Sequence, residues 1–531
     1  MSPDFEEASS ATWTIGSGLF ILLFALFFVR RLGHLDMDPR EPPLLQPTIP
    51  IIGHVVSMWR HGGGYYLELY RKSGGVARAA TLNILGQKFY VIFSPNLAQS
   101  AFRNRFLTAE RFTIQSATGV VGLSAEGKQI LEHGTLLQEF YREVPLALLS
   151  TESLSKMAST TLSTLTLDLG QLAAVSHGYK QLIPDLFGFL RHGLALATTD
   201  GLYGANANPL RSDPSLTDDV WTFDEAMFRL FFNVAPKLIA PAGHQARKRL
   251  QRVLISYFQD HPDNDAFPND AAEIVRMRAR IVRAAGFCDE DLGNMEIGMI
   301  HAALHNTAPI LFWLVVNVFA RPQVLASVRA EVEKLVEFDT PADSSSQQPT
   351  RRAILRASRV TDQSLCPYTA AVHREILRLC DSVTVTRFVD EDTTLSDGTL
   401  LRAGSLVHLP SAVAHRMPEV WGNHDSDVFE PGRMLDPEGT ASAMSDRKKA
   451  YWPFGAGKHL CPGRKFALAE NLTFVAALAV GFDIEGLDEK IVPHCPIANL
   501  MGQSVAKPEN TVSVTVRRRR GWELSTWQLL A

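Results

Sequence analysis

A short glycine-rich stretch carries the residues best suited to chemistry. It reads YWPFGAGKHLCPGRKFALAE over residues 451–470, with Cys461 at its centre. Phe454 stands before the cysteine, Gly457 lies between the two, and Gly463 follows. Glycine lets the backbone turn sharply and approach a flat object closely. A cysteine thiolate in such a loop is a strong ligand for a soft or borderline metal ion.

Basic residues surround this cysteine, and a helical pattern follows it. The run RKFALAENLTFVAALAV carries apolar residues at helical spacing, so we expect a helix to begin just after the cysteine. A helix N-terminus favours negative charge, and Lys458, His459 and Arg464 add positive charge nearby. We therefore expect Cys461 to be held as a thiolate. The alternative is a buried structural cysteine in a glycine-rich loop.

The segment FGAGKHLCPGR resembles the haem-binding signature of the cytochrome P450 family, F-x-x-G-x-x-x-C-x-G, with every fixed position filled. The resemblance covers roughly residues 35–531 and implies haem b as the cofactor. It makes Cys461 the axial ligand of the iron, where a thiolate promotes O–O cleavage. Phe454, Gly457 and Gly463 would then belong to the cofactor-binding loop.

A second motif is the pair Glu375 and Arg378 in the helical pattern AAVHREILRL. Side chains three residues apart on a helix face the same way and can form an ion pair, which is usually a surface salt bridge. The family carries this pair as E-x-x-R with a later arginine as third partner, and Arg433 in FEPGR stands at that place. We expect the three residues to be structural and required for haem loading, because breaking a buried ion cluster is costly.

A long apolar run over residues 290–320 predicts a buried helix. It resembles the central helix of the family, whose middle usually reads Ala/Gly-Gly-x-Asp/Glu-Thr. The counterpart here is ALHNT, from Ala303 to Thr307, in which the acid has become Asn306 and the glycine has become a leucine. The Asn-Thr-x-Pro variant resembles the steroid 7α-hydroxylase and prostacyclin synthase-like branch. That branch accommodates large, flat lipids.

A proline predicts an opening in this helix. Pro309 lacks the amide that would bond the carbonyl of His305, so we expect the helix to break there. The Asn306 amide and the Thr307 hydroxyl could then hold water beside bound oxygen and relay protons. The alternative is that they only satisfy the freed carbonyl.

The chain after the E-x-x-R motif alternates in a way that predicts strands over residues 383–389 and 405–409. By family position, Val383 and Val385 should border the substrate pocket, as should Ala303. Arg387 should contact a haem propionate, with His459 as the second donor, because buried carboxylates need charged donors.

One family feature is missing. The family usually shows Trp-x-x-x-Arg between about residues 110 and 150, but no tryptophan lies between Arg60 and Trp221. The propionate contact made by that arginine is therefore absent or made differently. Lys128, His133 and Arg142 are the candidate substitutes.

The N-terminus predicts a membrane anchor. Residues 13–29, WTIGSGLFILLFALFFV, carry no charge and are followed by two arginines. Such a helix spans on the order of 26 Å, the short end of a membrane-crossing length. The alternatives are a cleaved signal peptide, which the charge order disfavours, or a buried helix. We expect a lumenal segment 1–12, a basic and proline-rich hinge over 30–53, and a catalytic domain over 54–531 that faces the cytosol.

The length of the chain allows several domains or one large fold with insertions. Hydrophobic residues make up 46% of the 531 residues, which suffices for a large core. The net charge of −4 gives no indication of nucleic acid as a partner, and the five scattered cysteines favour a reducing compartment. The resemblance implies the P450 fold, mainly α with small β-sheets, after an N-terminal transmembrane helix. Further strands are expected over residues 76–82 and 88–93.

These observations lead to one functional hypothesis and two alternatives. The resemblance implies a single-pass protein of the endoplasmic reticulum membrane that oxidises a lipophilic substrate, such as a terpenoid, a steroid or another polycyclic secondary metabolite. It would use O₂ and electrons from NADPH through NADPH–cytochrome P450 reductase, docked near Lys458, Arg464 and Lys465. The alternatives are an isomerase or dehydratase that needs no external electrons, and a haem sensor or carrier without turnover.

Overall fold

The computed structural model describes residues 35–47, 52–172, 178–339, 351–422, 426–435, 441–489, 496–498 and 502–531. The expected lumenal segment 1–12 and the anchor 13–29 lie outside the described residues, as does the start of the hinge.

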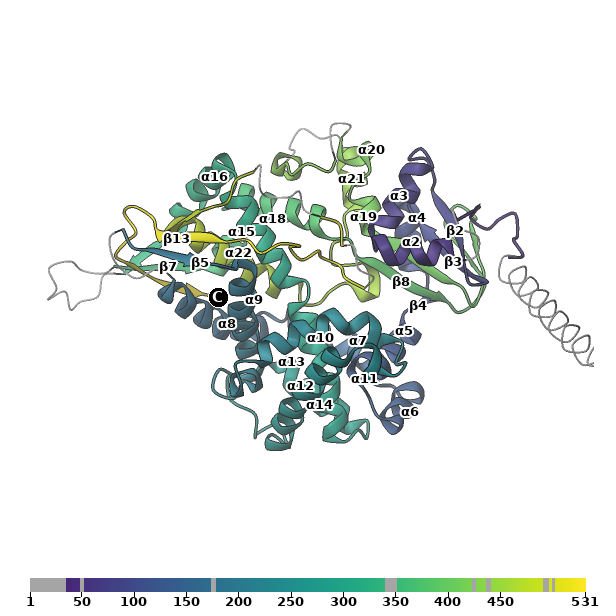
Figure 1. Cartoon of the computed structure of the whole chain (residues 1–531), viewed down its shortest axis with the longest axis horizontal. Coiled ribbons are helices and arrows are strands. Elements are labelled where there is room, and N and C mark those ends of the chain that lie inside the picture. The colour runs from purple at the N-terminus through teal and green to yellow at the C-terminus, as the bar shows by residue number, and fades with distance from the viewer. Residues whose placement is uncertain are drawn as a thin grey trace, which may run out of the picture.

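Helices form most of the described structure (Figure 1). They are α2 (Gly53–His61), α3 (Gly64–Lys72), α4 (Pro95–Arg103), α5 (Glu110–Ser116), α6 (Ala125–His133), α7 (Leu136–Leu149), α8 (Thr151–Gln171), α9 (Leu186–Tyr203), α10 (Leu216–Phe231), α11 (Pro236–Ile239), α12 (Pro241–Asp260), α13 (Glu273–Ala284), α14 (Asp289–Leu304), α15 (Thr307–Phe319), α16 (Pro322–Val332), α17 (Ala357–Val360), α18 (Pro367–Cys380), α19 (Ser411–Ala414), α20 (Pro418–Trp421), α21 (Ala441–Ala450) and α22 (Arg464–Gly481).

The strands form small sheets, as expected. They are β1 (Leu44–Leu45), β2 (Ala79–Ile84), β3 (Gln87–Ile92), β4 (Leu107–Thr108), β5 (Lys180–Ile183), β6 (Glu337–Asp339), β7 (Arg351–Arg356), β8 (Thr384–Val389), β9 (Thr393–Thr394), β10 (Leu400–Leu401), β11 (Leu406–Pro410), β12 (Phe482–Glu485), β13 (Val514–Arg518) and β14 (Ser525–Leu530).

The largest sheet has the strand order β1-β2-β3-β11-β8-β4. The predicted strands appear as β2, β3, β8 and β11. The pairs β2/β3 and β8/β11 are both antiparallel, with Thr81 opposite Tyr90 and Arg387 opposite Val407. In Figure 1 this sheet and α2 to α4 lie at one end of the molecule, while β5, β7 and β13 lie toward the other end. The smaller sheets are β12-β13-β5, β14-β7-β6 and β10-β9.

The apolar run over residues 290–320 forms the core of the molecule, as predicted. Every residue of α15 is buried, which explains why it is apolar all round. Within the part of the chain that the structure describes, Asp289–Phe319 is the one helix long and apolar enough to cross a membrane by composition, and 83% of its most apolar window is buried inside the protein. The predicted break is confirmed, because α14 ends at Leu304 and α15 begins at Thr307, just ahead of Pro309.

Candidate active site

The loop around Cys461 turns back on itself immediately before α22. The amide of Cys461 donates to the carbonyl of Phe454 at 3.0 Å, which closes the loop. Gly457 has φ +66°, and a Cβ at that position would lie 2.6 Å from the carbonyl oxygen of Phe102. Only glycine therefore allows this close approach. The loop presents the half-buried cysteine beside the first turn of α22.

A cavity of about 490 Å³, here called the cysteine cavity, lies between this loop and the break in the central helix. Residues from three separate regions of the chain line it. They are Phe454, Gly455, His459, Cys461 and Gly463 from the loop, Ala303, Asn306 and Thr307 from the helix break, and Val383, Val385 and Arg387 from β8 and the residue before it. The structure thus brings the predicted metal-ligand, helix-break and substrate-pocket residues, with Arg387, His459 and two of the other loop residues, to one space. Gly457 supports the loop without lining the cavity.

The expectation that basic neighbours keep Cys461 ionised is wrong for the protein without a metal. Burial raises the pKa of the Cys461 thiol, and the nearby charge of Arg464 opposes this only in part. Burial also lowers the pKa of His459 to about 4, so its ring is neutral at pH 7. Lys458 pairs with Glu110, Nζ to Oε1 at 3.4 Å. A metal ion bound at this sulfur would deprotonate the coordinating thiol.

Two buried donors meet at the edge of the cysteine cavity. Arg387 is buried and donates from Nη1 to the carbonyl of Thr386 at 2.8 Å, and no carboxylate forms an ion pair with it among the described residues. Burial lowers the pKa of Arg387. The Nε2 atom of His459 is buried without a hydrogen-bond partner there. Together with the Cys461 sulfur in the cavity wall, an arginine without a carboxylate partner and an unsatisfied histidine nitrogen fit a haem whose propionates they would receive.

The substitutes considered for the missing Trp-x-x-x-Arg contact are wrong, because none lines the cavity. Their side chains make local contacts: Lys128 with Glu132, His133 with the carbonyl of Gln129, and Arg142 with Glu143. Tyr141, which directly precedes Arg142, was not among the predicted residues. The ring of Tyr141 packs edge-on against His459 with 4.8 Å between ring centroids. Of the three candidates only Arg142 lies on the same helix, α7, and Tyr141 itself does not line the cavity.

The helix break presents its polar groups to the cavity. The Thr307 hydroxyl donates to the carbonyl of Ala303 at 2.7 Å, not to the carbonyl of His305 that Pro309 leaves free. Asn471 on α22 donates to the carbonyl of Thr307 at 3.1 Å and ties the break to the cysteine helix. Asn306 lines the cavity with its side chain exposed to it. The hydroxyl and the amide are thus available to a ligand or to water in the cavity.

The three residues of the expected ion cluster meet away from the cavity. Both nitrogens of the Arg378 fork bond Glu375, at 2.8 and 2.7 Å, and both side chains are fully buried. Arg433 reaches the same carboxylate, with Nε 3.7 Å from Oε1. Arg378 also donates to the carbonyls of His415 and Ser426, each at 2.7 Å. The cluster joins α18 to the segment that leads toward the cysteine loop.

Two buried carboxyl groups, Asp381 and Glu470, also line the cavity and were not predicted from the sequence. Burial raises the pKa of Asp381 and that of Glu470 to about 8 each, so both are largely protonated at pH 7. Ser411 donates to Asp381 at 2.6 Å, and Thr198 donates to Glu470 at 2.9 Å. No local pattern marks these acids, because their burial depends on distant elements.

Comparison with known proteins agrees with this geometry. The family model for cytochrome P450 matches residues 222–516, which include the helix break and the cysteine loop. The chain is 32% identical to a cytochrome P450 monooxygenase of Gibberella zeae over 520 residues, covering 95% of this chain and 94% of the relative. It is 28% identical to the cytochrome P450 monooxygenase nodJ of Hypoxylon pulicicidum over 516 residues, 96% of each. A 25-hydroxycholesterol 7-alpha-hydroxylase of Rattus norvegicus is 27% identical over 290 residues, 54% of this chain and 67% of the relative.

Proposed function

Because the chain belongs to the cytochrome P450 family and is an oxidoreductase of the P450 type, we propose that it hydroxylates or otherwise oxidises a lipophilic polycyclic molecule, such as a terpenoid or a steroid. The observation that carries the proposal is that Cys461 and Thr307 line one cavity from opposite elements. A haem bound there would supply oxygen activation and insertion of oxygen into a C–H bond.

Residues of this chain would bind the haem and orient the substrate. Cys461 would hold the iron, while Arg387 and His459 would receive the propionates. Ala303, Val383 and Val385 give the cavity an apolar wall that would orient a lipophilic substrate and exclude water. The rat relative, whose name gives a hydroxycholesterol as its substrate, supports a polycyclic lipid.

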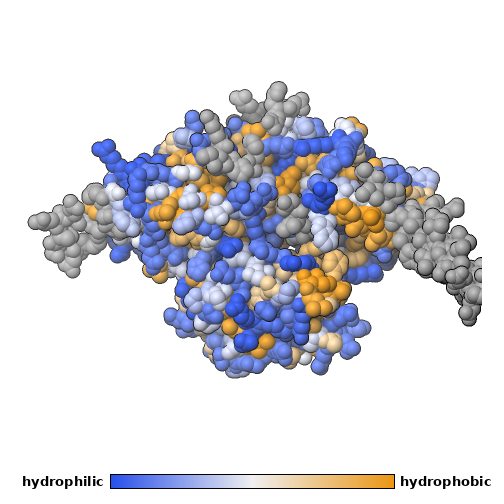
Figure 2. All heavy atoms as spheres, viewed as in Figure 1, coloured by the Kyte–Doolittle hydropathy of each residue, from blue (hydrophilic) through white to orange (hydrophobic). Residues whose placement is uncertain are grey.

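The surface supports association with a membrane. Exposed apolar side chains gather on and beside α10 and α11, where Figure 2 shows a hydrophobic area, and Trp59 on α2 contacts Phe228 of α10 at 6.5 Å between ring centroids. This apolar patch consists of Trp59, Phe112, Phe232, Val234, Leu238 and Ile239. Exposed patches of this kind typically contact lipid or protein. We place the protein on the cytosolic side of the endoplasmic reticulum membrane, held by residues 13–29.

Electrons would enter from NADPH–cytochrome P450 reductase on the side of the cysteine loop. Lys458 and Lys465 are exposed there, and Arg464 opens α22 beside them. Positive charge on this surface suits an acidic docking partner.

The experiment that tests the proposal is a product screen. The full-length protein, expressed in membranes with a reductase, is incubated with terpenoid and steroid libraries, and oxidised products are sought by mass spectrometry. We expect products that contain oxygen from O₂ and that require NADPH. Turnover without NADPH would indicate an isomerase or dehydratase, for which the altered Leu304 and Asn306 leave room while the retained Thr307 argues against it. A haem-loaded protein that consumes no O₂ with any library member would indicate a sensor or carrier.

The Thr307 hydroxyl gives a sharper test of proton delivery. In Thr307→Ala we expect the rate of product formation to fall by about 10²-fold, the low end of what a positioned proton-transfer group contributes, while NADPH consumption continues and peroxide is released. Thr307→Ser keeps the hydroxyl and is the matched control. In this variant we expect NADPH consumption to remain coupled to product formation. The readout is product and peroxide formed per NADPH. Full coupling in the alanine variant would exclude Thr307 from the relay.

A further inference from the structure

A second cavity of about 540 Å³, the outer cavity, lies beside the cysteine cavity. The two cavities have no lining residue in common. Residues that are neighbours in the sequence, however, line different cavities. His305 lines the outer cavity and Asn306 the cysteine cavity. Likewise Gln503 and Lys507 line the outer cavity, whereas Ser504 and Val505 line the cysteine cavity. The helix break and the segment 503–507 therefore form the partition between the two spaces.

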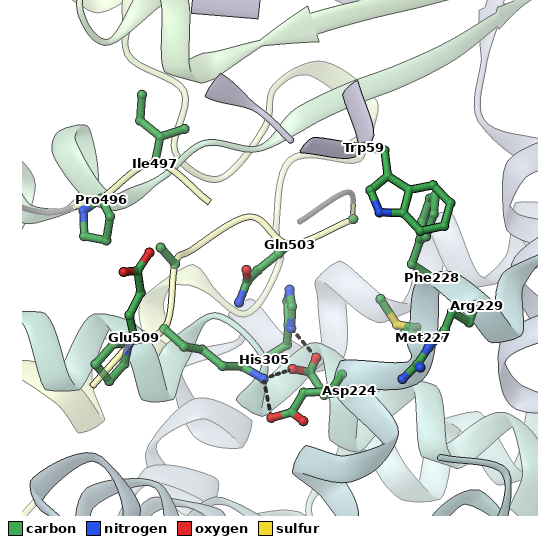
Figure 3. Close-up of a pocket in the computed structure, with 15 residues that line it drawn as sticks. Trp59, Asp224, Met227, Phe228, Arg229, His305, Pro496, Ile497, Gln503 and Glu509 are labelled. Carbon is green, nitrogen blue, oxygen red and sulfur yellow. Dashed lines mark hydrogen bonds and ion pairs between the residues drawn. The ribbon is translucent and has the colours of Figure 1, made fainter. Parts of the chain in front are cut away.

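The outer cavity combines apolar walls with one buried polar cluster (Figure 3). Trp59, Met227, Phe228, Pro496 and Ile497 supply the apolar surface. At its inner end lies Asp224 of α10, a buried carboxylate with three donors. His301 donates from Nε2 to Oδ1 at 2.9 Å, His305 donates from Nδ1 to the same oxygen, and Lys507 donates from Nζ to Oδ2.

These hydrogen bonds determine which nitrogen of His305 carries the proton. Asp224 is held ionised, because the donors around it lower its pKa well below the usual value in spite of burial. An ionised carboxylate only accepts hydrogen bonds, so Nδ1 of His305 carries the proton. In the neutral tautomer that has its proton on Nδ1, the Nε2 atom bears a lone pair and accepts a hydrogen bond.

That acceptor is buried and unsatisfied. His305 is 7% exposed, and its Nε2 has no hydrogen-bond partner among the described residues. Figure 3 shows this nitrogen on the far side of the ring from Asp224, toward Gln503 and the open space of the cavity. A buried acceptor without a partner is unfavourable, and native structures almost always supply one from the protein, from water or from a ligand.

A metal ion is a weaker fit to the same residues. Nitrogens of His301 and His305 and an oxygen of Asp224 lie within 4.8 Å of one another, which is the spacing of a candidate metal site. The ammonium group of Lys507, however, already occupies the second oxygen of Asp224 and neutralises its charge. A divalent cation would have to displace Lys507 and remove the proton from the bond between His305 and Asp224.

We propose that the outer cavity binds a hydroxyl-bearing lipophilic molecule, the substrate of the proposed oxidation, whose O–H donates to Nε2 of His305. The apolar walls would take the hydrocarbon next to the hydroxyl, and a carbon of the same molecule would reach the cysteine cavity only where the skeleton passes between the helix break and residues 503–507. The inference rests on the proposed function and adds to it that the substrate already carries an alcohol.

The test uses pairs of probes that differ only in whether they can donate a hydrogen bond. Dodecanol, farnesol and androstanol are each compared with their methyl ethers, and binding to the haem-loaded full-length protein in nanodiscs is measured by calorimetry. For at least one skeleton, wild type should bind the alcohol about tenfold more tightly than the ether, which corresponds to about 1.4 kcal/mol. His305→Leu should abolish this preference. His301→Gln, which keeps an amide donor near Asp224 and does not line the cavity, should retain it.

Two outcomes would overturn the inference. The first is equal binding of alcohol and ether by wild type on all three skeletons, a comparison that needs no variant to fold. The second is stoichiometric binding of Zn²⁺ that His301→Gln and His305→Leu both remove, because it would assign the cluster to a metal. The experiments distinguish failure of this inference from failure of the proposed function. NADPH-dependent products without alcohol preference refute this inference alone, whereas alcohol preference without any oxidised product refutes the monooxygenase.

Discussion

Cys461→Ser is expected to abolish the thiolate-type Soret band of the reduced carbon monoxide complex and all product formation. The serine hydroxyl is a poor ligand for iron in place of a thiolate, and the cysteine cavity offers no second cysteine among the described residues. Because burial disfavours a free thiolate at this site, the sulfur and the iron stabilise one another, and loss of the sulfur should also weaken haem retention. The measurement is the absorption spectrum of the purified, reduced protein with carbon monoxide.

The exposed Cys288 provides the matched control. Cys288→Ser also replaces a sulfur with an oxygen, but at the N-terminal end of α14 and outside the cysteine cavity. It should leave both the spectrum and the turnover unchanged. If Cys461→Ser kept the wild-type spectrum, a different residue would be the ligand and the assignment of the whole loop would be wrong. An imidazole-type spectrum in wild type would contradict it equally.

Glu375→Gln is expected to lower the free energy of unfolding by about 3–5 kcal/mol, because it leaves Arg378 charged, fully buried and without its carboxylate. Arg433 loses the same partner. We therefore expect little haem-loaded protein at the wild-type expression temperature. The measurement is urea unfolding of the solubilised protein, together with the haem-to-protein ratio.

The control is an ion pair of the same type on the surface. Glu68 pairs with Lys72 at 2.6 Å on α3, with the lysine side chain 65% exposed. Glu68→Gln should cost only about 0.3–0.5 kcal/mol, since water screens and replaces the interaction. Equal costs for the two variants would mean that burial of the Glu375 cluster contributes nothing and that its role in haem loading must be sought elsewhere.

Local features of the fold followed from the sequence alone. The cysteine loop, the helix after it and the break at Pro309 each depend on residues within one or two turns of one another. Glycine φ angles, a missing proline amide and the i, i+3 spacing of Glu375 and Arg378 act over that range, so a linear pattern reports them well.

Tertiary structure alone decided the electrostatics of the site. Asp224 and Lys507 are separated by 283 residues, and nothing near either one predicts that α10 and the C-terminal segment meet beside His305. Tyr141 packs against His459 because helix α7 turns that face toward the cysteine loop, which no local pattern predicts. The pKa of the Cys461 thiol is raised, contrary to expectation, because desolvation depends on every atom packed around the sulfur, whereas the sequence shows only the charges beside it.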